Sequence, residues 1–255
     1  MEVLILSFAA ICLPLFPLSW FFNRVVASLP AGVAQALALI VLPQAGLDVL
    51  VLAPQPMEWP DSWRHYGMLW AIFTALFYSF RALSARDLGV WTRLLVTSGL
   101  ALTWVGWLEG VRLATLHIFV LSWSLPAALL LLLAGVLIQR IGGAYLGLKG
   151  GLALMMPRMT ASVTLSVLAL AGTPIFPTFF VLLNYFWRLP IGIVPALLLL
   201  PFLWAWAVGR LFQNLLFGDY RGDVVADLEG GKAFFVGLAL FASLFLSLYG
   251  KGVGL

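Results

Sequence analysis

Four ionisable side chains lie in or beside long apolar stretches of the sequence. Asp48 follows a Pro-Gln-Ala-Gly break in one stretch, and Arg210 lies near the end of another. Glu109 and His117 flank a short turn between two further stretches. A charge at the centre of a bilayer costs roughly 2.5–3.5 kcal/mol, so such residues usually face a cavity or a partner and often relay protons. The candidate proton-relay residues are therefore Asp48, Glu109, His117 and Arg210.

Each candidate also has an interpretation without proton transfer. Asp48 can reach the membrane surface or pair with an arginine, and Arg210 can extend its charge to the surface along its apolar stem or pair with a carboxylate. Glu109 and Arg112 have the spacing of helical neighbours, but they lie in a turn that water can solvate. Uncharged polar residues in apolar stretches are expected to hydrogen bond between helices: Gln35, Gln44 and Asn184.

No group of residues in the sequence has the make-up of a catalytic or metal centre. The single cysteine, Cys12, lies in an apolar run, and the two histidines, His65 and His117, are far apart. The glycine-rich stretch 142–151 does not match the phosphate-binding loop signature. We therefore expect a non-enzymatic chain with no cofactor and no metal, and the net charge of +4 suggests no nucleic-acid partner.

The composition restricts the fold to a helical membrane protein. Of 255 residues, 63% are hydrophobic and 9% are charged, and the mean hydropathy is +1.08. A soluble domain carries roughly 25% charged residues and cannot hide so much apolar surface. A membrane barrel needs short alternating segments, whereas this chain has long unbroken apolar runs. We therefore expect an all-α, polytopic helix bundle that forms one integral membrane domain, in contact with lipid, over residues 1–255.

About eight apolar segments are long enough to cross a bilayer, which takes about 20 residues. The sixth contains Gly172, Pro174 and Pro177, so we expect an interruption there. The first follows Met1-Glu2, an acidic start that favours a retained anchor over a cleaved signal peptide. The predicted spans cover residues 3–22, 31–53, 65–83, 89–108, 113–138, 160–187, 190–217 and 233–249.

The positive charges predict an orientation. With eight spans, ten of the 14 lysines and arginines fall on one side of the membrane and four on the other. Cytoplasmic loops carry the excess of such residues, and dividing the sixth span into two crossings weakens the asymmetry. The sequence therefore favours a multi-pass protein of the inner (plasma) membrane with both termini on its non-cytoplasmic side.

Six short motifs occur in a fixed order between residues 65 and 250. They are ALSARDL at 82–88, GVLIQR at 135–140, GGL at 150–152 with Met156-Pro157, AGTP at 171–174, the segment 210–218, and DLE at 227–229. In this order they resemble the proton-conducting antiporter-like membrane subunits of complex I, Mrp Na⁺/H⁺ antiporters, membrane hydrogenases and inorganic-carbon uptake complexes. The resemblance implies structural roles for Asp87, Arg140, Gly150, Gly151, Pro157, Gly172, Pro174 and Glu229.

The same resemblance exposes departures from the family. Full-length members are longer, so residues 1–54, two N-terminal spans, would correspond to their opening helices, with most of the first inverted repeat absent. Where the family carries its conducting lysine, histidine, and lysine or glutamate, alignment places Gly89, the vicinity of Trp123 and the vicinity of Leu182. These side chains do not titrate, so the resemblance implies that the fold is kept without the standard proton pathway.

Three functional hypotheses remain open. The first is a non-catalytic accessory subunit of a proton- or ion-coupled membrane complex, packed against a full-length antiporter-like subunit. By analogy alone, an inorganic-carbon uptake or Mrp-like assembly is favoured over complex I as its host. The second is a proton- or cation-translocating subunit of a complex I-like NADH dehydrogenase or hydrogenase that uses the four relay candidates. The third is a stand-alone small transporter.

Overall fold

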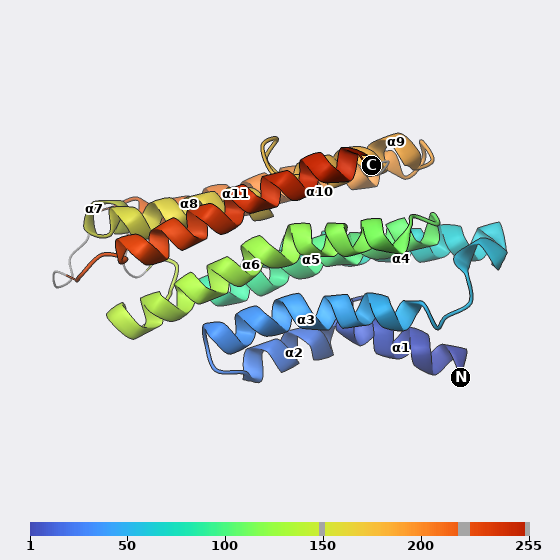
Figure 1. The fold of residues 1–255 in the computed structure, drawn as a ribbon, viewed down its shortest axis with the longest axis horizontal. Coiled ribbons are helices and arrows are strands. Elements are labelled where there is room, and N and C mark those ends of the chain that lie inside the picture. Colours follow the sequence, from blue (N-terminus) through green and yellow to red (C-terminus); the bar gives the residue numbers. More distant parts are fainter. Residues whose placement is uncertain (148–150, 219–224, 253–255) are drawn as a thin grey trace.

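The computed structural model describes residues 1–147, 151–218 and 225–252. The described residues form an all-α bundle, and their isolated β-bridge joins Asp87 to Tyr145. The helices run side by side along the long axis of the molecule (Figure 1). They are α1 (Glu2–Cys12), α2 (Ser19–Ser28), α3 (Val33–Leu50), the 3₁₀ helix η1 (Pro56–Glu58), α4 (Asp61–Ala82), α5 (Leu88–Leu108), α6 (Leu113–Ile141), α7 (Leu152–Met155), α8 (Pro157–Leu170), α9 (Pro177–Arg188), α10 (Val194–Leu211), the π-helix η2 (Phe212–Leu216) and α11 (Gly230–Gly252).

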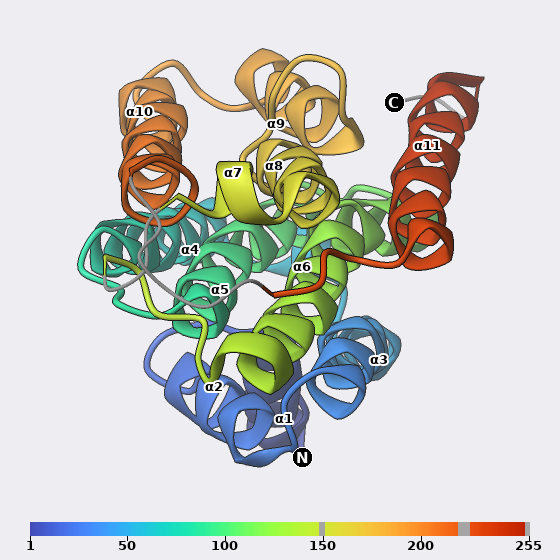
Figure 2. The ribbon, with the colours of Figure 1, turned by 90° about the vertical axis from the view of Figure 1, so that its left-hand side faces the viewer.

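The helices form three layers, with α1–α3 on one side, α4–α6 in the middle and α7–α11 on the other side (Figure 1). Seen end-on, α5 and α6 occupy the centre between the two outer layers (Figure 2). Nearly every side chain of α5 is buried. A helix that is apolar around its whole circumference is expected in such a central position.

Four helices of the described residues are by themselves long and apolar enough to cross a membrane: α3, α5, α6, and α10 together with η2. The described apolar parts of α1 and α11 are shorter. The structure therefore confirms an all-α bundle with apolar helices, while the predicted number of eight crossings is not confirmed.

The prediction of one continuous first span over 3–22 is wrong. Helix α1 ends at Cys12 and α2 begins at Ser19, with Pro14 and Pro17 in the connection. Proline has no backbone N–H and clashes with the preceding turn, so two prolines in one short stretch end the helix. A broken helix of this kind needs other donors for the freed carbonyl groups.

Side chains of the middle layer supply those donors. The indole N–H of Trp104 donates to the carbonyl of Leu13 at 2.9 Å, and that of Trp70 donates to the carbonyl of Phe16 at 2.7 Å. The hydroxyl of Thr74 accepts from the backbone N–H of Phe16 at 3.3 Å. The α1–α2 break is therefore held by specific bonds from α4 and α5.

The interruption of the sixth predicted span is confirmed. Helix α8 ends at Leu170 and α9 begins at Pro177. Between them Gly172 has a φ of +72°, a backbone conformation that favours glycine. The hydroxyl of Thr178 donates to the carbonyl of Ala169 at 2.6 Å and so satisfies one group at the end of α8.

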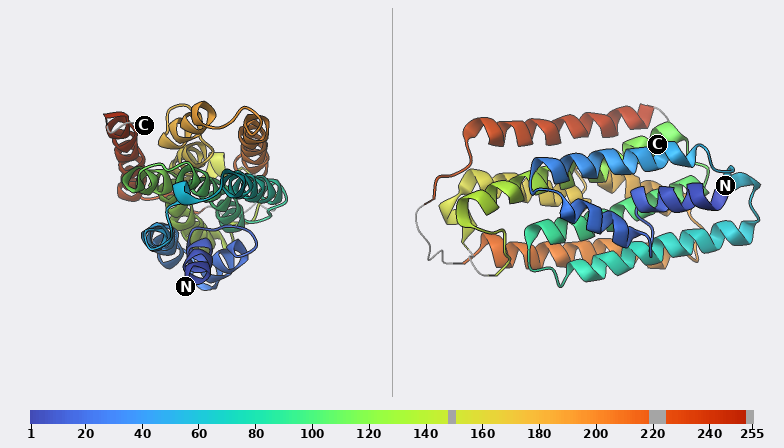
Figure 3. Two further views of the ribbon diagram at one scale, coloured as in Figure 1. Left: turned by 90° about the vertical axis from the view of Figure 1, so that its right-hand side faces the viewer. Right: turned by 90° about the horizontal axis from the view of Figure 1, so that it is seen from below.

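The two broken helices run in opposite directions. The α1–α2 pair runs from the N-terminal end of the bundle to its far end, and α3 returns, whereas α8–α9 runs the other way and α10 returns (Figure 1). The view from below shows the same opposed course of α1–α2 and α3 (Figure 3). Inverted-topology repeats in transporters have this directional relation.

Several motif residues meet where α6, α8 and α11 approach one another. Arg140 donates to the carbonyl of Ala226, just before α11. The carboxylate of Asp227 accepts from the backbone N–H groups of Arg158 at 2.9 Å and Met159 at 3.1 Å. Pro157 is the first residue of α8, a position where its missing N–H costs nothing.

The Asp227 carboxylate caps α8 from a distant part of the chain. Burial alone raises its pKa, but the backbone N–H groups of Arg158, Met159 and Leu228, together with the Arg158 charge, outweigh burial. Its pKa therefore lies below the ordinary value, and the anion is the stable form at neutral pH.

The remaining motif residues have local roles. Asp87 caps α5 by accepting from the N–H of Val90 at 3.0 Å. Glu229 pairs with Lys232 at 3.0 Å. Gly151 has a φ of +84° and donates its N–H to the carbonyl of Phe217 at 3.1 Å, whereas Gly150 lies outside the described residues.

Candidate functional site

Two of the four relay candidates are in contact. Asp48 in the last turn of α3 and His117 in the second turn of α6 approach within 3.4 Å, from Oδ1 to Nε2. Gln44, one turn before Asp48, joins them from the other side of the imidazole. The structure thus assembles a carboxylate–imidazole–amide chain from α3 and α6.

The hydrogen bonds of Gln44 determine the tautomer of His117. The Gln44 Nε2 donates to the backbone carbonyl of His117 at 3.2 Å, and a carbonyl can only accept. The Gln44 Oε1 therefore faces His117 Nδ1 and accepts a hydrogen bond from its N–H. Neutral His117 carries its proton on Nδ1, so the contact with Asp48 becomes an ion pair only when Nε2 is also protonated.

The Asp48–His117 pair lies at the surface of the chain. The Asp48 side chain is 69% exposed and the His117 side chain is 29% exposed. Both belong to helix ends at the N-terminal end of the bundle (Figure 1). The pair can exchange a proton with its surroundings there, but it is not a pathway through the bundle.

Glu109 belongs to a different part of the same end. It lines a polar cavity of about 530 Å³ together with Asp61, Arg64 and His65 at the start of α4. Arg64 pairs with Asp61 at 2.5 Å. The structure records no ion pair between Glu109 and Arg112, although both are described.

Arg210 lies apart from the other three candidates. It is an exposed residue in the last turn of α10, at the end of the bundle opposite Asp48 and His117. The structure therefore brings together one pair of the four candidates and does not connect them into a chain.

The middle of the bundle is filled by two tryptophans. Trp123 from α6 and Trp204 from α10 are fully buried, and their rings meet edge to face with centroids 6.3 Å apart. Gly99 of α5 makes room for this pair, because a Cβ atom there would lie 2.3 Å from the Trp123 ring. Gly99 is thus required by the close approach of an indole ring.

The polar groups around these tryptophans are hydroxyls. The Trp204 indole N–H donates to Ser79 at 2.8 Å and to Ser98 at 3.1 Å, and the two serine hydroxyls are 2.7 Å apart. Ser79 also donates to the carbonyl of Ala75 at 2.8 Å. Neither serine nor tryptophan changes its charge in the physiological range, so this network stores no proton.

The positions aligned with the family's conducting residues are all buried. Trp123 belongs to the tryptophan pair, and Leu182 of α9 is 3% exposed. Gly89 of α5 is also buried, and a Cβ there would lie 3.1 Å from the Asp87 carboxylate. The residues at these three positions do not titrate themselves, although the Asp87 carboxylate and the Arg93 guanidinium both lie within 4 Å of the Cβ position at Gly89.

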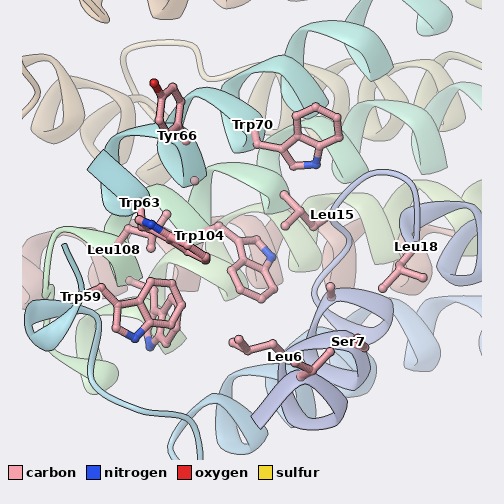
Figure 4. Close-up of a pocket in the computed structure, with 14 residues that line it drawn as sticks. Leu6, Ser7, Leu15, Leu18, Trp59, Trp63, Tyr66, Trp70, Trp104 and Leu108 are labelled. Atoms are coloured by element: carbon pink, nitrogen blue, oxygen red, sulfur yellow. The ribbon is translucent and has the colours of Figure 1, made fainter. Parts of the chain in front are cut away.

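An aromatic cavity of about 570 Å³ lies between α1, η1, α4 and α5 (Figure 4). The residues that line it include Trp59, Trp63 and Trp104, together with Leu6 of α1 and Leu15 of the α1–α2 connection. The Trp104 indole already donates to the α1–α2 connection. The cavity suits apolar chains rather than ions, because its lining is mostly aliphatic and aromatic and no charged side chain is among the lining residues.

Sequence reasoning identified Gln44 as a polar residue that bonds between helices, and the structure confirms this. Gln35 instead donates to the carbonyl of Leu29 in the α2–α3 connection, and Asn184 accepts from Arg188 of its own helix. The Ser79–Ser98–Trp204 network was missed. Serines in apolar stretches were its only signal, and their spacing does not show that α4, α5 and α10 meet.

Comparison with known proteins shows the fold. Neither a protein-family model nor a curated protein sequence matches the chain. Solved structures do: a chain of respiratory complex I from Thermus thermophilus has a TM-score of 0.78 and 24% identity, with 97% of this chain and 55% of that chain covered. A chain of the Mrp complex from Dietzia sp. DQ12-45-1b has a TM-score of 0.76 and 17% identity, over 98% and 56% of the two chains.

A chain of the archaeal membrane-bound sulfane sulfur reductase matches with a TM-score of 0.78 and 19% identity, over 96% of this chain and 52% of that chain. The present chain thus spans just over half the length of these neighbours. Because the three structural matches cover 96–98% of this chain, they include most of residues 1–54. The structural similarity therefore extends beyond residues 65–250, where the sequence motifs lie. The chain has the fold of antiporter-like subunits of membrane complexes, as the sequence motifs implied.

Proposed function

We propose that this chain is a non-conducting accessory subunit of a multi-subunit, proton- or ion-coupled membrane complex. The observation that carries the proposal is the Trp123–Trp204 pair at the centre of the bundle. A proton path needs titratable groups or water within hydrogen-bonding reach, and two fully buried indoles, of which Trp123 packs against Gly99, supply neither.

The structural neighbours support a role as a subunit. All three neighbours are chains of respiratory or other membrane complexes. The accessory role includes lateral packing against a full-length antiporter-like subunit within the inner membrane. An Mrp-like or inorganic-carbon uptake assembly is the host that we favour, by analogy.

Co-purification tests the accessory role. The tagged chain is isolated from its native membrane in a mild detergent, and the proteins that elute with it are identified and quantified. We expect integral membrane partners at fixed stoichiometry, including one with intramembrane lysines. A chain that elutes alone in several mild detergents would contradict the proposal and favour a stand-alone transporter.

The Asp48–His117 contact favours a second candidate function, a relay at one face of the chain. In this alternative, protons pass between His117 Nε2 and Asp48 and then to a neighbouring subunit, which the exposure of Asp48 permits. Asp48→Asn keeps the size of the side chain and removes its charge. Loss of ion-coupled activity in a complex that still assembles would support the relay, whereas wild-type activity would exclude it.

A further inference from the structure

Three arginines from three helices surround one cavity. Arg24 of α2, Arg81 of α4 and Arg93 of α5 line a space of about 200 Å³ together with Asn23 and other residues. Water occupies about 30 Å³ per molecule in the liquid, so the cavity has room for a hydrated anionic group. Three cations that converge on one space repel one another unless an anion lies between them.

Among the described residues, no carboxylate forms a salt bridge with these arginines. None of the recorded salt bridges involves Arg24, Arg81 or Arg93. Asp87 is the carboxylate whose charge acts on Arg93, but it lies beyond salt-bridge distance and caps α5 through Val90. The cluster therefore keeps its positive charge available to a ligand.

Two of the side chains around the cavity are held in place. The Arg81 guanidinium lies 5.7 Å from the ring centroid of Phe77 and 5.9 Å from that of Tyr78. Such cation–π contacts orient a guanidinium without neutralising it. The Tyr78 hydroxyl is fixed by a 2.9 Å hydrogen bond to Ser19.

Asn23 also lines the cavity, and its amide is held in one orientation. Its Nδ2 donates to the carbonyl of Ser19 and to the hydroxyl of Thr97, both at 3.0 Å. Thr97 already donates to the carbonyl of Arg93 at 2.8 Å, so it must accept from Asn23. The orientation of the amide is thus determined, and its Oδ1 is left buried without a partner.

The cavity lies near the positively charged end of the bundle and beside an apolar surface. Exposed apolar side chains border it or continue from it on α2 and α5: Trp20, Phe21, Val25 and Val90. The described basic residues near this end are Arg24, Arg81, Arg86, Arg93, Arg140, Arg158, Arg210 and Lys232, against Arg64, Arg112, Arg188 and Lys251 near the other end. Basic pockets between membrane helices on the cytoplasmic side bind anionic lipid headgroups.

We propose that the cavity lined by Arg24, Arg81 and Arg93 binds the headgroup of an anionic phospholipid. The phosphate lies among the guanidinium groups, and the acyl chains lie along the exposed apolar side chains of α2 and α5. The proposal is independent of the accessory role, because a conducting subunit could hold the same lipid.

Native mass spectrometry of the purified chain, or of its complex, tests the site. Phosphatidylglycerol, phosphatidylethanolamine and inorganic phosphate are titrated separately into delipidated protein. We expect selective retention of phosphatidylglycerol, with about a fivefold weaker affinity for each arginine changed to glutamine, as about 1 kcal/mol per basic residue implies. Arg86→Gln is the matched control, because Arg86 is exposed at the same end but does not line the cavity.

The double variant Arg24→Gln/Arg81→Gln avoids the more buried Arg93 and keeps the test valid if Arg93→Gln does not fold. In this double variant the rise in thermal stability caused by phosphatidylglycerol should be lost, while Arg86→Gln retains it. Equal lipid binding by the double variant and the wild type would overturn the proposal. Phosphate binding without lipid selectivity, or occupancy of the arginines only by an acidic segment of a partner subunit, would overturn it as well.

Discussion

Substitution of Gly99 by alanine tests the tryptophan-filled centre of the bundle. A Cβ at this position would lie 2.3, 2.4 and 2.5 Å from three atoms of the Trp123 indole. Unstrained carbon atoms are about 3.5–4.0 Å apart, so the ring must move by about 1 Å or more. The Trp123 ring contacts Trp204 as well as Gly99, so a shift of this ring away from Gly99 also disturbs its contact with Trp204. Overpacking of this kind typically costs about 1–3 kcal/mol.

The assay is thermal unfolding of the purified chain in detergent. For a chain of this size about 1 kcal/mol corresponds to roughly 2–4 °C, so Gly99→Ala should lower the midpoint by about 2–12 °C. Gly209→Ala in α10 is the control, because a Cβ there meets nothing within 4 Å. It should be neutral or stabilising, as alanine favours a helix over glycine by about 0.5–1 kcal/mol.

A second substitution makes the test specific to the Trp123 ring. Trp123→Ala removes the three ring atoms that the new methyl group would strike, so the double variant Gly99→Ala/Trp123→Ala should be more stable than the sum of its single effects predicts. If Gly99→Ala were as stable as Gly209→Ala, Trp123 would not be tightly packed against Gly99 and Trp204. The claim that this tryptophan pair closes the centre of the bundle to protons would then be refuted.

Three further predictions concern other parts of the chain. Asp227→Ala should cost about 0.5–2 kcal/mol by removing the cap of α8. Because the folded-state pKa of Asp227 lies below the unfolded value of about 3.9, its contribution is complete above that value and is lost as the pH falls through the folded pKa. Melting curves of wild type and variant should therefore differ at pH 7 and converge in acid. Trp104→Phe should leave the carbonyl of Leu13 unpaired, at a cost of about 1–3 kcal/mol, and faster hydrogen exchange in residues 13–18 would show it. Asp48→Asn should leave the ion-coupled activity of the host complex unchanged, and loss of activity would favour the relay with His117.

Much of the fold was predictable because apolar run length and proline position act locally. The broken α8–α9 pair follows from Gly172 and Pro174 in one stretch, and the structure has it. The α1–α2 break had the same kind of signal in Pro14 and Pro17. It was missed because the stretch is apolar throughout, and hydropathy does not show whether a helix is continuous.

The candidate site was predictable in part. Asp48 and His117 were identified separately, because a charge in an apolar stretch is conspicuous in any sequence. Their contact depends on the packing of α3 against α6, which no local pattern specifies. For the same reason the sequence did not show that Gly99 faces Trp123, or that three arginines share one cavity.

Proton flux through reconstituted vesicles tests the central claim most directly. The purified chain is incorporated into liposomes that contain a pH-sensitive dye, and a potassium diffusion potential with valinomycin drives proton entry. If the Trp123–Trp204 pair closes the centre of the bundle, the proton flux should equal that of protein-free vesicles, with or without Asp48→Asn. A flux well above the vesicle background that Asp48→Asn abolishes would contradict the account and establish the chain as a proton conductor.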